Sequence, residues 1–276
     1  MSAPRGDDVG AYQRRLMSGL SLALGGANVI MQLSRPSVGH GIVESTVESG
    51  SLYAHPVKRT RTTLAYIMIA LFGTDHERDV IRREVDQQHR SVRSSPESSV
   101  SYNAFDPELQ LWVGACMYRG LEDAALLLYG DSSGEWLDSV YGHSARFATT
   151  LQVPVSMWPA NREAFEQYWS DALQLVAMDD TTRKFLYGLA SLDFLPLALR
   201  VVFGRPHRFI TTGFLPAKFR DELGLEWSNR RQRVFTTICA IMARTNRWLP
   251  RLAREFPWNI VLWDTRRRIH AGRRIV

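Results

Sequence analysis

His89 lies in a segment whose pattern turns its imidazole toward the protein interior. Read as a helix over residues 75–93, this segment places three apolar residues on one stripe of the 3.6-residue repeat: Ile81, Val85 and Val92. His89 follows Val85 by four residues and precedes Val92 by three, so it belongs to the same stripe. A buried imidazole needs a partner for at least one ring nitrogen. The spacing therefore marks a candidate metal ligand, with a hydrogen-bonded core histidine as the alternative.

Arg59 and Thr63 form a second pair of polar residues at inward positions. Stepping back by fours from Ile67, on the buried stripe of a helix predicted over residues 56–72, reaches Thr63 and then Arg59. Arginine offers a fixed fork of donors suited to a carboxylate, and threonine offers a hydroxyl. The alternative is an arginine that reaches solvent from the helix start and a threonine bonded back to its own helix. Spacing alone leaves both interpretations open.

Helical periodicity dominates the rest of the chain and predicts the elements that position these residues. We expect one all-α, multi-helix globular domain over residues 1–276, with flexible termini at 1–10 and 265–276. Asp106 before Pro107 and Thr74 before the His89 helix are good N-caps, and Gly73 and Gly130 are typical helix ends. Helices are predicted over residues 12–24, 28–33, 38–46, 56–72, 75–93, 106–129, 133–151, 162–178, 181–190, 195–203, 216–223 and 228–247.

Composition indicates an ordinary globular protein with an ample core. Of the 276 residues, 45% are hydrophobic and 22% charged. The longest apolar run, residues 65–72, is far shorter than the roughly 20 residues that span a bilayer. No apolar signal segment follows the N-terminus, and the two cysteines, Cys116 and Cys239, are expected to be free thiols. We therefore expect a cytoplasmic protein.

The net charge of +6 is concentrated at the C-terminal end of the sequence. Residues 244–276 contain nine arginines and two acidic residues, a net charge of +7, which leaves −1 for the rest of the chain. This basic terminus lacks interleaved aromatic residues or a recognisable binding motif. We expect a solvated tail, no nucleic-acid partner, and at most peripheral contact with a membrane through this terminus.

Several common catalytic and binding motifs are missing from the sequence. It contains no GxxxxGK[ST], GxGxxG, GxSxG or HExxH motif, and no CxxC pair. The other histidines show no metal-ligand spacing, so each is expected at the surface, in a loop, or hydrogen-bonded in the core. Asp179 and Asp180 are expected to cap and charge a helix start rather than to form a carboxylate site.

Four sequence runs resemble the MpaB/rubber oxygenase (latex clearing protein) family. Residues 27–73 resemble the family's LQ…P…V…G segment, here with MQL in place of LQ, followed by R-x-x-x-T and a final phenylalanine–glycine. VDQQHRSVR, residues 85–93, is similar to the family's V-x-x-x-H-x-x-V-R. SYNAFDPELQLWVGACMY, residues 101–118, is similar to Y-x-A-x-D-P-E-L-x-x-W-V, and LPAKFRDELGLEW, residues 215–227, matches further downstream.

The resemblance implies a haem b protein, with the haem held between core helices. His89 stands at the position of the family's proximal haem ligand, and Arg59 and Thr63 match the R-x-x-x-T that lies close to the haem. Glu44 is near the place of the rubber oxygenases' catalytic glutamate, as is Glu48. Gly114 stands where many relatives have a histidine, and no residue matches the lysine that caps the iron in rubber oxygenases.

We therefore expect a haem b-dependent oxygenase that acts with dioxygen on an apolar, isoprenoid or lipid-like substrate. The iron would carry out the oxygen chemistry, and the protein would supply the axial His89, a mostly apolar cavity and the polar anchors Arg59 and Thr63. A non-catalytic haem- or lipid-binding helical protein is the alternative, because Gly114 and the missing lysine depart from the family pattern. The sequence predicts no oligomeric state.

Overall fold

Helices and short connections make up the computed structural model, which describes residues 17–45, 52–130 and 134–275. Within these ranges there is no β-strand, only an isolated antiparallel bridge between Arg93 and Asn103. The prediction of an all-α fold is confirmed. No helix in the described ranges has the length and apolar character needed to cross a membrane.

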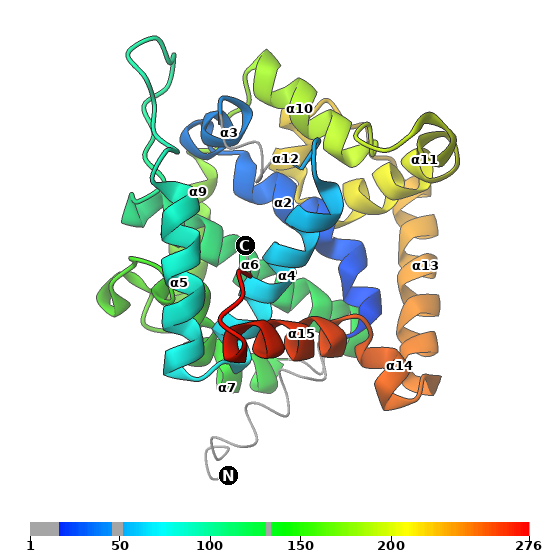
Figure 1. Ribbon diagram of the computed structural model, residues 1–276. Helices are drawn as coiled ribbons and strands as arrows, with labels where there is room; N and C mark the ends of the chain where they lie inside the picture. Colours follow the sequence, from blue (N-terminus) through cyan, green and yellow to red (C-terminus); the bar gives the residue numbers. More distant parts are fainter. Residues whose placement is uncertain (1–16, 46–51, 131–133, 276) are drawn as a thin grey trace.

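Helix α6 (Pro107–Tyr129) is the central element of the fold (Figure 1). Asp106 caps its start by accepting a hydrogen bond from the Glu108 N–H at 2.8 Å, and the chain leaves it at Gly130, where φ is +67°. Because 13 of its 23 residues are buried, α6 is enclosed on most sides. It packs against α2 (Gly25–Leu33), α8 (Arg146–Thr149) and α13 (Asn229–Trp248).

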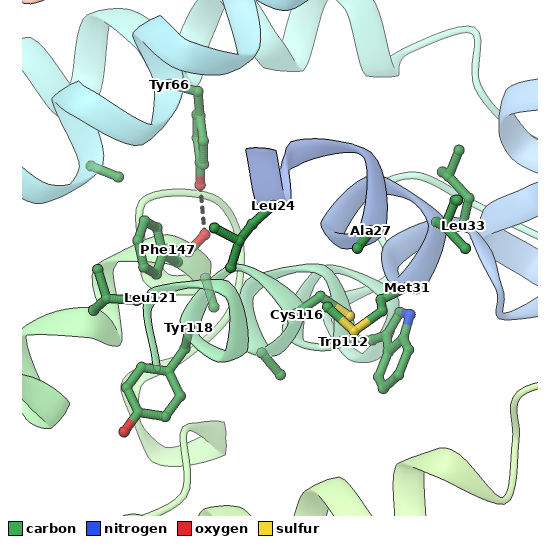
Figure 2. Packing of buried hydrophobic residues seen from close by; sticks show 14 of the residues in the cluster. Leu24, Ala27, Met31, Leu33, Tyr66, Trp112, Cys116, Tyr118, Leu121 and Phe147 are labelled. Carbon is green, nitrogen blue, oxygen red and sulfur yellow. Dashed lines mark hydrogen bonds between the residues drawn. The ribbon is translucent and has the colours of Figure 1, made fainter. Parts of the chain in front are cut away.

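Aromatic side chains fill much of the core around α6. Trp112 of α6 stacks on Trp169 with ring centroids 5.2 Å apart, and Tyr118 meets Phe165 edge-on at 4.7 Å. Figure 2 shows Trp112 and Cys116 beside Met31 of α2, and the Tyr66 hydroxyl donating to the Phe147 carbonyl, a hydrogen bond of 2.8 Å. This hydrogen bond ties the helix that carries Arg59 to the chain around α8.

Gly114 lets α6 and α8 approach each other closely. A Cβ atom at this position would lie 2.7 Å from the Ala148 Cβ and 3.1 Å from the Ala148 Cα and N. The space that a histidine side chain would need is therefore occupied by the backbone of α8. Helix packing explains why this chain has glycine here.

Gly114→Ala is expected to lower the melting temperature by several degrees, because the added methyl group would overpack the contact with Ala148 at a cost of about 1–3 kcal/mol. Gly142→Ala is the matched control, since nothing lies within 4 Å of its added Cβ and alanine favours a helix over glycine. Thermal unfolding followed by circular dichroism would compare the two. Equal stability of the two variants would contradict the close-packing explanation.

Helices α4 (Pro56–Phe72) and α5 (Asp75–His89) carry the predicted site residues. The bounds of α4 agree with the prediction. A capping box starts α5: the Thr74 hydroxyl accepts from the Glu77 N–H at 3.2 Å, and Glu77 Oε2 accepts from the Thr74 N–H at 2.8 Å. The helix ends at His89, four residues before the predicted end, because the following residues turn and pair with the 102–104 segment.

The remaining helices follow the predicted order with some different bounds. The predicted helix over 133–151 is divided at Ala145, and the helix predicted to end at residue 203 continues through Pro206 to Phe214. Near the N-terminus a 3₁₀ helix, η1, replaces the described part of the predicted 12–24 helix. The other elements are η1 (Gly19–Leu24), α3 (Pro36–Val43), α7 (Gly134–Ser144), η4 (Val155–Met157), α9 (Arg162–Leu173), α10 (Asp180–Ala190), α11 (Leu197–Phe214) and α12 (Ala217–Glu222).

Two helices in the basic C-terminal region, α14 (Arg251–Glu255) and α15 (Trp258–His270), were not predicted. Helix α15 packs on α4 and α5, and Arg266 donates to Glu77 Oε1 at 3.0 Å and to the Phe72 carbonyl at 2.9 Å. The chain then returns between α5 and α4, as Figure 1 shows. The segment expected to be a flexible terminus therefore makes defined contacts in the structure.

Ile275 anchors this returning segment. Its side chain is fully buried, its N–H donates to Glu84 Oε2 at 2.7 Å, and its carbonyl accepts from Arg61 Nη2 at 3.0 Å. Glu84 belongs to α5 and Arg61 to α4, so one residue bonds to both helices.

Ile275→Ala is expected to destabilise the protein by about 2–5 kcal/mol, because it removes a buried side chain from the junction of α4 and α5. Arg273→Ala, at an exposed position two residues earlier, is expected to change the stability by less than about 0.5 kcal/mol. Urea unfolding of both variants would measure the difference. A wild-type-like midpoint for Ile275→Ala would show that the segment does not hold the two helices.

Candidate functional site

His89 is the last residue of α5 and is half-buried. Its ring meets Phe105 edge-on, with centroids 6.2 Å apart and planes at 84°. The Nδ1 atom is buried and has no hydrogen-bond partner. Buried polar atoms are normally hydrogen-bonded, but no described residue provides a partner for this nitrogen. Its lack of a partner therefore needs an explanation.

The imidazole of His89 is neutral at physiological pH. Burial, the larger cause, and the positive charge of Arg59 together lower its pKa to about 4, and only Asp86 acts in the opposite direction. A neutral ring carries a free lone pair, which is the form that binds a metal. The structure thus brings His89 and Arg59 together and keeps the histidine in its ligating form.

Arg59 holds a positive charge without a balancing carboxylate. Arg59 is exposed, so its side chain reaches solvent from the start of α4, as the second sequence interpretation has it, although the surrounding protein lowers the pKa of its guanidinium. Among the residues that the structure describes, no Asp or Glu lies within ion-pair distance of it. Such a cation favours an anionic ligand.

Thr63 bonds back to its own helix. Its hydroxyl donates to the Arg59 carbonyl at 3.0 Å, and the neighbouring Thr62 hydroxyl donates to the same oxygen at 3.0 Å. Back-bonding was the alternative that the spacing left open for Thr63. Both threonines therefore fix the turn that carries Arg59, and Thr63, which is half-buried, lies one turn away from it.

Glu44 belongs to a separate hydrogen-bond network at the end of α3. Its carboxylate pairs with His40 Nδ1 at 2.6 Å and accepts from the Ser98 hydroxyl at 2.7 Å and the Tyr102 hydroxyl at 3.1 Å. The hydrogen bond to His40 is the main cause that lowers the Glu44 pKa. These contacts do not include His89, so the structure does not join Glu44 directly to the Arg59–His89 pair. Glu48, the other candidate, lies outside the described residues.

His40 was missed as an organising residue, although its i, i+4 spacing to Glu44 could have indicated it. It is only 5% exposed, and its Nε2 lies 2.7 Å from Asp179 Oδ2, beside the N-cap of α10. Burial alone would lower its pKa, but the hydrogen bonds to Glu44 and Asp179 outweigh burial and raise it. The two carboxylates thus favour a charged imidazole that joins α3 to α10.

The Glu44 network adjoins the end of α5 through a short hairpin. The Ala104 N–H donates to the Val92 carbonyl at 3.0 Å, the Ser94 N–H donates to the Tyr102 carbonyl at 2.9 Å, and the Val92 N–H donates to the His89 carbonyl at 3.0 Å. Tyr102 therefore links Glu44 to the turn that follows His89. Glu44 can influence His89 through this backbone but not through a direct contact.

The described residues contain no cluster of three or more His, Cys, Asp or Glu side chains able to hold a bare metal ion. Two surface hollows, of about 620 Å³ along α9 and about 280 Å³ beside α5 and α8, include neither His89 nor Arg59. A single histidine beside a single uncompensated arginine fits haem, which offers iron to one imidazole nitrogen and propionates to a guanidinium. The residues present therefore fit the group that the sequence resemblance implies.

The family assignment agrees with this geometry. Residues 12–244 match the model for the catalytic domain described as "ER-bound oxygenase mpaB/B'/Rubber oxygenase". The chain belongs to this family. It accordingly has an oxygenase-type catalytic domain, in which the Arg59–His89 pair lies inside the matched range.

Two mycobacterial proteins are similar to the chain over nearly its whole length. Uncharacterized protein Mb2261 of Mycobacterium bovis and Uncharacterized protein Rv2237 of Mycobacterium tuberculosis are each 48% identical over 255 residues. In each case the match covers 92% of this chain and 100% of the relative. No solved structure matches the chain.

The His89 ring is expected to titrate near pH 4 rather than 6.5 in the protein without haem, as measured from its Cε1–H chemical shift. Because the unfolded chain takes up a proton at higher pH than the folded protein, this residue's contribution to stability is complete above pH 6.5. It is lost as the pH falls toward 4 and amounts to on the order of 3 kcal/mol.

Arg59→Gln tests the cause of that shift. Removing the guanidinium charge is expected to raise the His89 midpoint, while burial keeps it below 6.5. Arg90→Gln is the control, because Arg90 is exposed and next to His89 in sequence but is not among the causes of the shift. A midpoint near 6.5 in the wild type, or equal shifts in both variants, would contradict the proximity of Arg59 and His89.

Proposed function

We propose that this protein is a haem b-dependent oxygenase that uses dioxygen to oxidise an apolar substrate of isoprenoid or lipid-like chemistry. The observation that carries the proposal is the buried, unpartnered Nδ1 of a neutral His89 beside the uncompensated charge of Arg59, in a chain of the oxygenase family. The chain's free cysteines, Cys116 and Cys239, agree with a reducing, cytoplasmic location, which we propose as well.

His89 would hold the iron of the haem through one ring nitrogen. Its low pKa keeps the ring neutral, so the ligating lone pair stays available without competition from a proton across the physiological range. The bound iron would activate dioxygen. Phe105, edge-on to the imidazole, restricts the orientation of the ring and excludes water from that side.

Arg59 would bind a propionate or another anionic group. The surrounding protein lowers the pKa of its guanidinium, and an anion beside it would stabilise the charged form through a charge-assisted pair. Thr63 and Thr62 would act as positioning residues, because their hydroxyls hold the carbonyl of the Arg59 turn.

Glu44 would position the site rather than transfer protons. Three hydrogen bonds satisfy its carboxylate and its pKa is lowered, which makes it a weak base. It would fix the hairpin that follows His89, through Tyr102. This role differs from the catalytic one that the family resemblance implies.

A haem- or lipid-binding protein without turnover is the second candidate. It is favoured by Gly114, since this chain has neither a side chain nor free space where many relatives have a histidine. Any contribution of that side chain to turnover is missing here.

Haem reconstitution tests the leading proposal. The wild-type protein is expected to give a Soret band with haemin, and His89→Ala to bind haemin at least tenfold more weakly with a shifted band, because the axial ligand is lost. His76→Ala is the control, since His76 is an exposed residue of the same helix. A wild-type spectrum for His89→Ala would refute the assignment of the ligand.

Oxygen consumption by the reconstituted protein with an isoprenoid such as squalene separates the two candidate functions. An oxygenase should consume oxygen with the substrate, and Arg59→Ala should slow this consumption while Arg59→Lys retains part of it. A normal Soret band without substrate-dependent consumption would instead support the binding protein.

A further inference from the structure

Exposed apolar side chains are concentrated on one part of the surface. Of the eighteen large hydrophobic residues that are exposed in the described part of the chain, twelve lie between residues 197 and 263. They belong to α11, α13, α14 and α15 and to the residue after α14; Figure 1 shows α11, α13 and α14 along one side of the molecule. The twelve are Leu197, Leu199, Val201, Val202, Phe203, Val234, Ile241, Trp248, Leu252, Phe256, Ile260 and Trp263. Monomeric proteins seldom leave so much apolar surface without a partner.

Helix α13 presents a regular outward stripe. Val234, Ile241 and Trp248 are spaced by seven residues and are 48, 60 and 80% exposed. Two exposed arginines fall on or beside the same stripe: Arg230 four residues before Val234, and Arg244 three residues after Ile241. The stripe therefore carries both large apolar and cationic side chains.

Two more exposed apolar residues follow α13. They are Leu252 of α14 and Phe256, the residue after that helix. On the other side, α11 packs on α13 through the edge-on contact of Phe214 with Phe235, whose centroids are 4.9 Å apart. We call α11, α13 and α14 together the basic–apolar face.

The charge of this face is entirely positive along its two long helices. Helices α11 and α13 contain eight arginines and no acidic residue: Arg200, Arg205, Arg208, Arg230, Arg231, Arg233, Arg244 and Arg247. The five on α13 are exposed, and within the described ranges none of them forms an ion pair. In the C-terminal segment, by contrast, Arg266 pairs with Glu77 and Arg268 with Asp264. All five arginines of α13 thus lack an ion pair within the described ranges, whereas in the tail this holds for Arg273 and Arg274.

We propose that the basic–apolar face binds the surface of an anionic lipid membrane. A lipid surface accommodates both properties, because arginines pair with phosphates while exposed apolar and tryptophan side chains enter the acyl boundary. A second copy of the chain would oppose arginines with arginines across a two-fold axis. A nucleic acid would leave Trp248 and Leu252 without an apolar environment. The proposal does not depend on haem binding.

Co-sedimentation with vesicles tests the proposal on the full-length protein. Binding is expected to vesicles with one third phosphatidylglycerol in phosphatidylcholine, and to weaken with added salt and with pure phosphatidylcholine. Ile241→Asp and the double variant Arg230→Gln/Arg244→Gln should each reduce binding at least tenfold.

Val155→Asp and Leu175→Asp are the matched controls, because these residues are 75 and 59% exposed but lie away from the face. Both controls should bind like the wild type. Circular dichroism of each variant establishes that the fold is kept. Brominated lipids should also quench less fluorescence in Trp248→Phe than in the wild type, which reports contact at this side chain directly.

Three results would overturn the proposal. The first is a wild-type protein that does not sediment with anionic vesicles. The second is an equal loss of binding in the control variants. The third is a wild-type dimer, seen by analytical ultracentrifugation, that becomes monomeric in Ile241→Asp, because the face would then join two copies of the chain. None of these results involves the Soret band, so a failure here is distinguishable from a failure of the haem proposal.

Discussion

Arg59 places a positive charge next to the imidazole of His89, and among the described residues no carboxylate forms an ion pair with it, Asp86 acting only on the ring. In a folded protein such an arrangement costs free energy, because the buried Nδ1 of His89 has no partner and the positive charge beside the ring is not paired with an acid. Without a ligand, the folded protein gains no stability from keeping these groups close together. A ligand that supplies both a metal and an anion removes both costs at once, which is why we interpret the strain as a preformed binding site.

Hydrogen bonds and an ion pair between the surrounding helices hold Arg59 and His89 in place. Glu77 takes part in two of these contacts. One of its carboxylate oxygens caps α5 through Thr74, and the other pairs with Arg266 of α15. Ile275 bonds to α4 and α5 together. On the opposite side of α4, Tyr66 bonds to the Phe147 carbonyl. The site thus depends on contacts that join segments distant in sequence.

Local patterns in the sequence predicted much of this arrangement. The bounds of α4 and the start of α5 followed from Pro56, Thr74 and the apolar repeat. The pairing of Arg59 with His89 could not be derived, because periodicity places each residue on a helix face but does not orient two helices. The same holds for α15, whose arginines resemble a solvated tail until Glu77 is brought beside them. Helix α11 likewise continues past its predicted end at residue 203 and through Pro206.

The position of Ile275 has a consequence for the order in which the protein assembles. Helices α4 and α5 are synthesised long before Ile275, the residue that bonds to both and follows Glu84 by 191 residues. While α15 and the segment up to Ile275 remain inside the ribosome, they cannot pack on α4 and α5. The contacts around the helices that carry Arg59 and His89 are therefore completed only after Ile275 has emerged, and a prosthetic group would meet a complete site only from that moment.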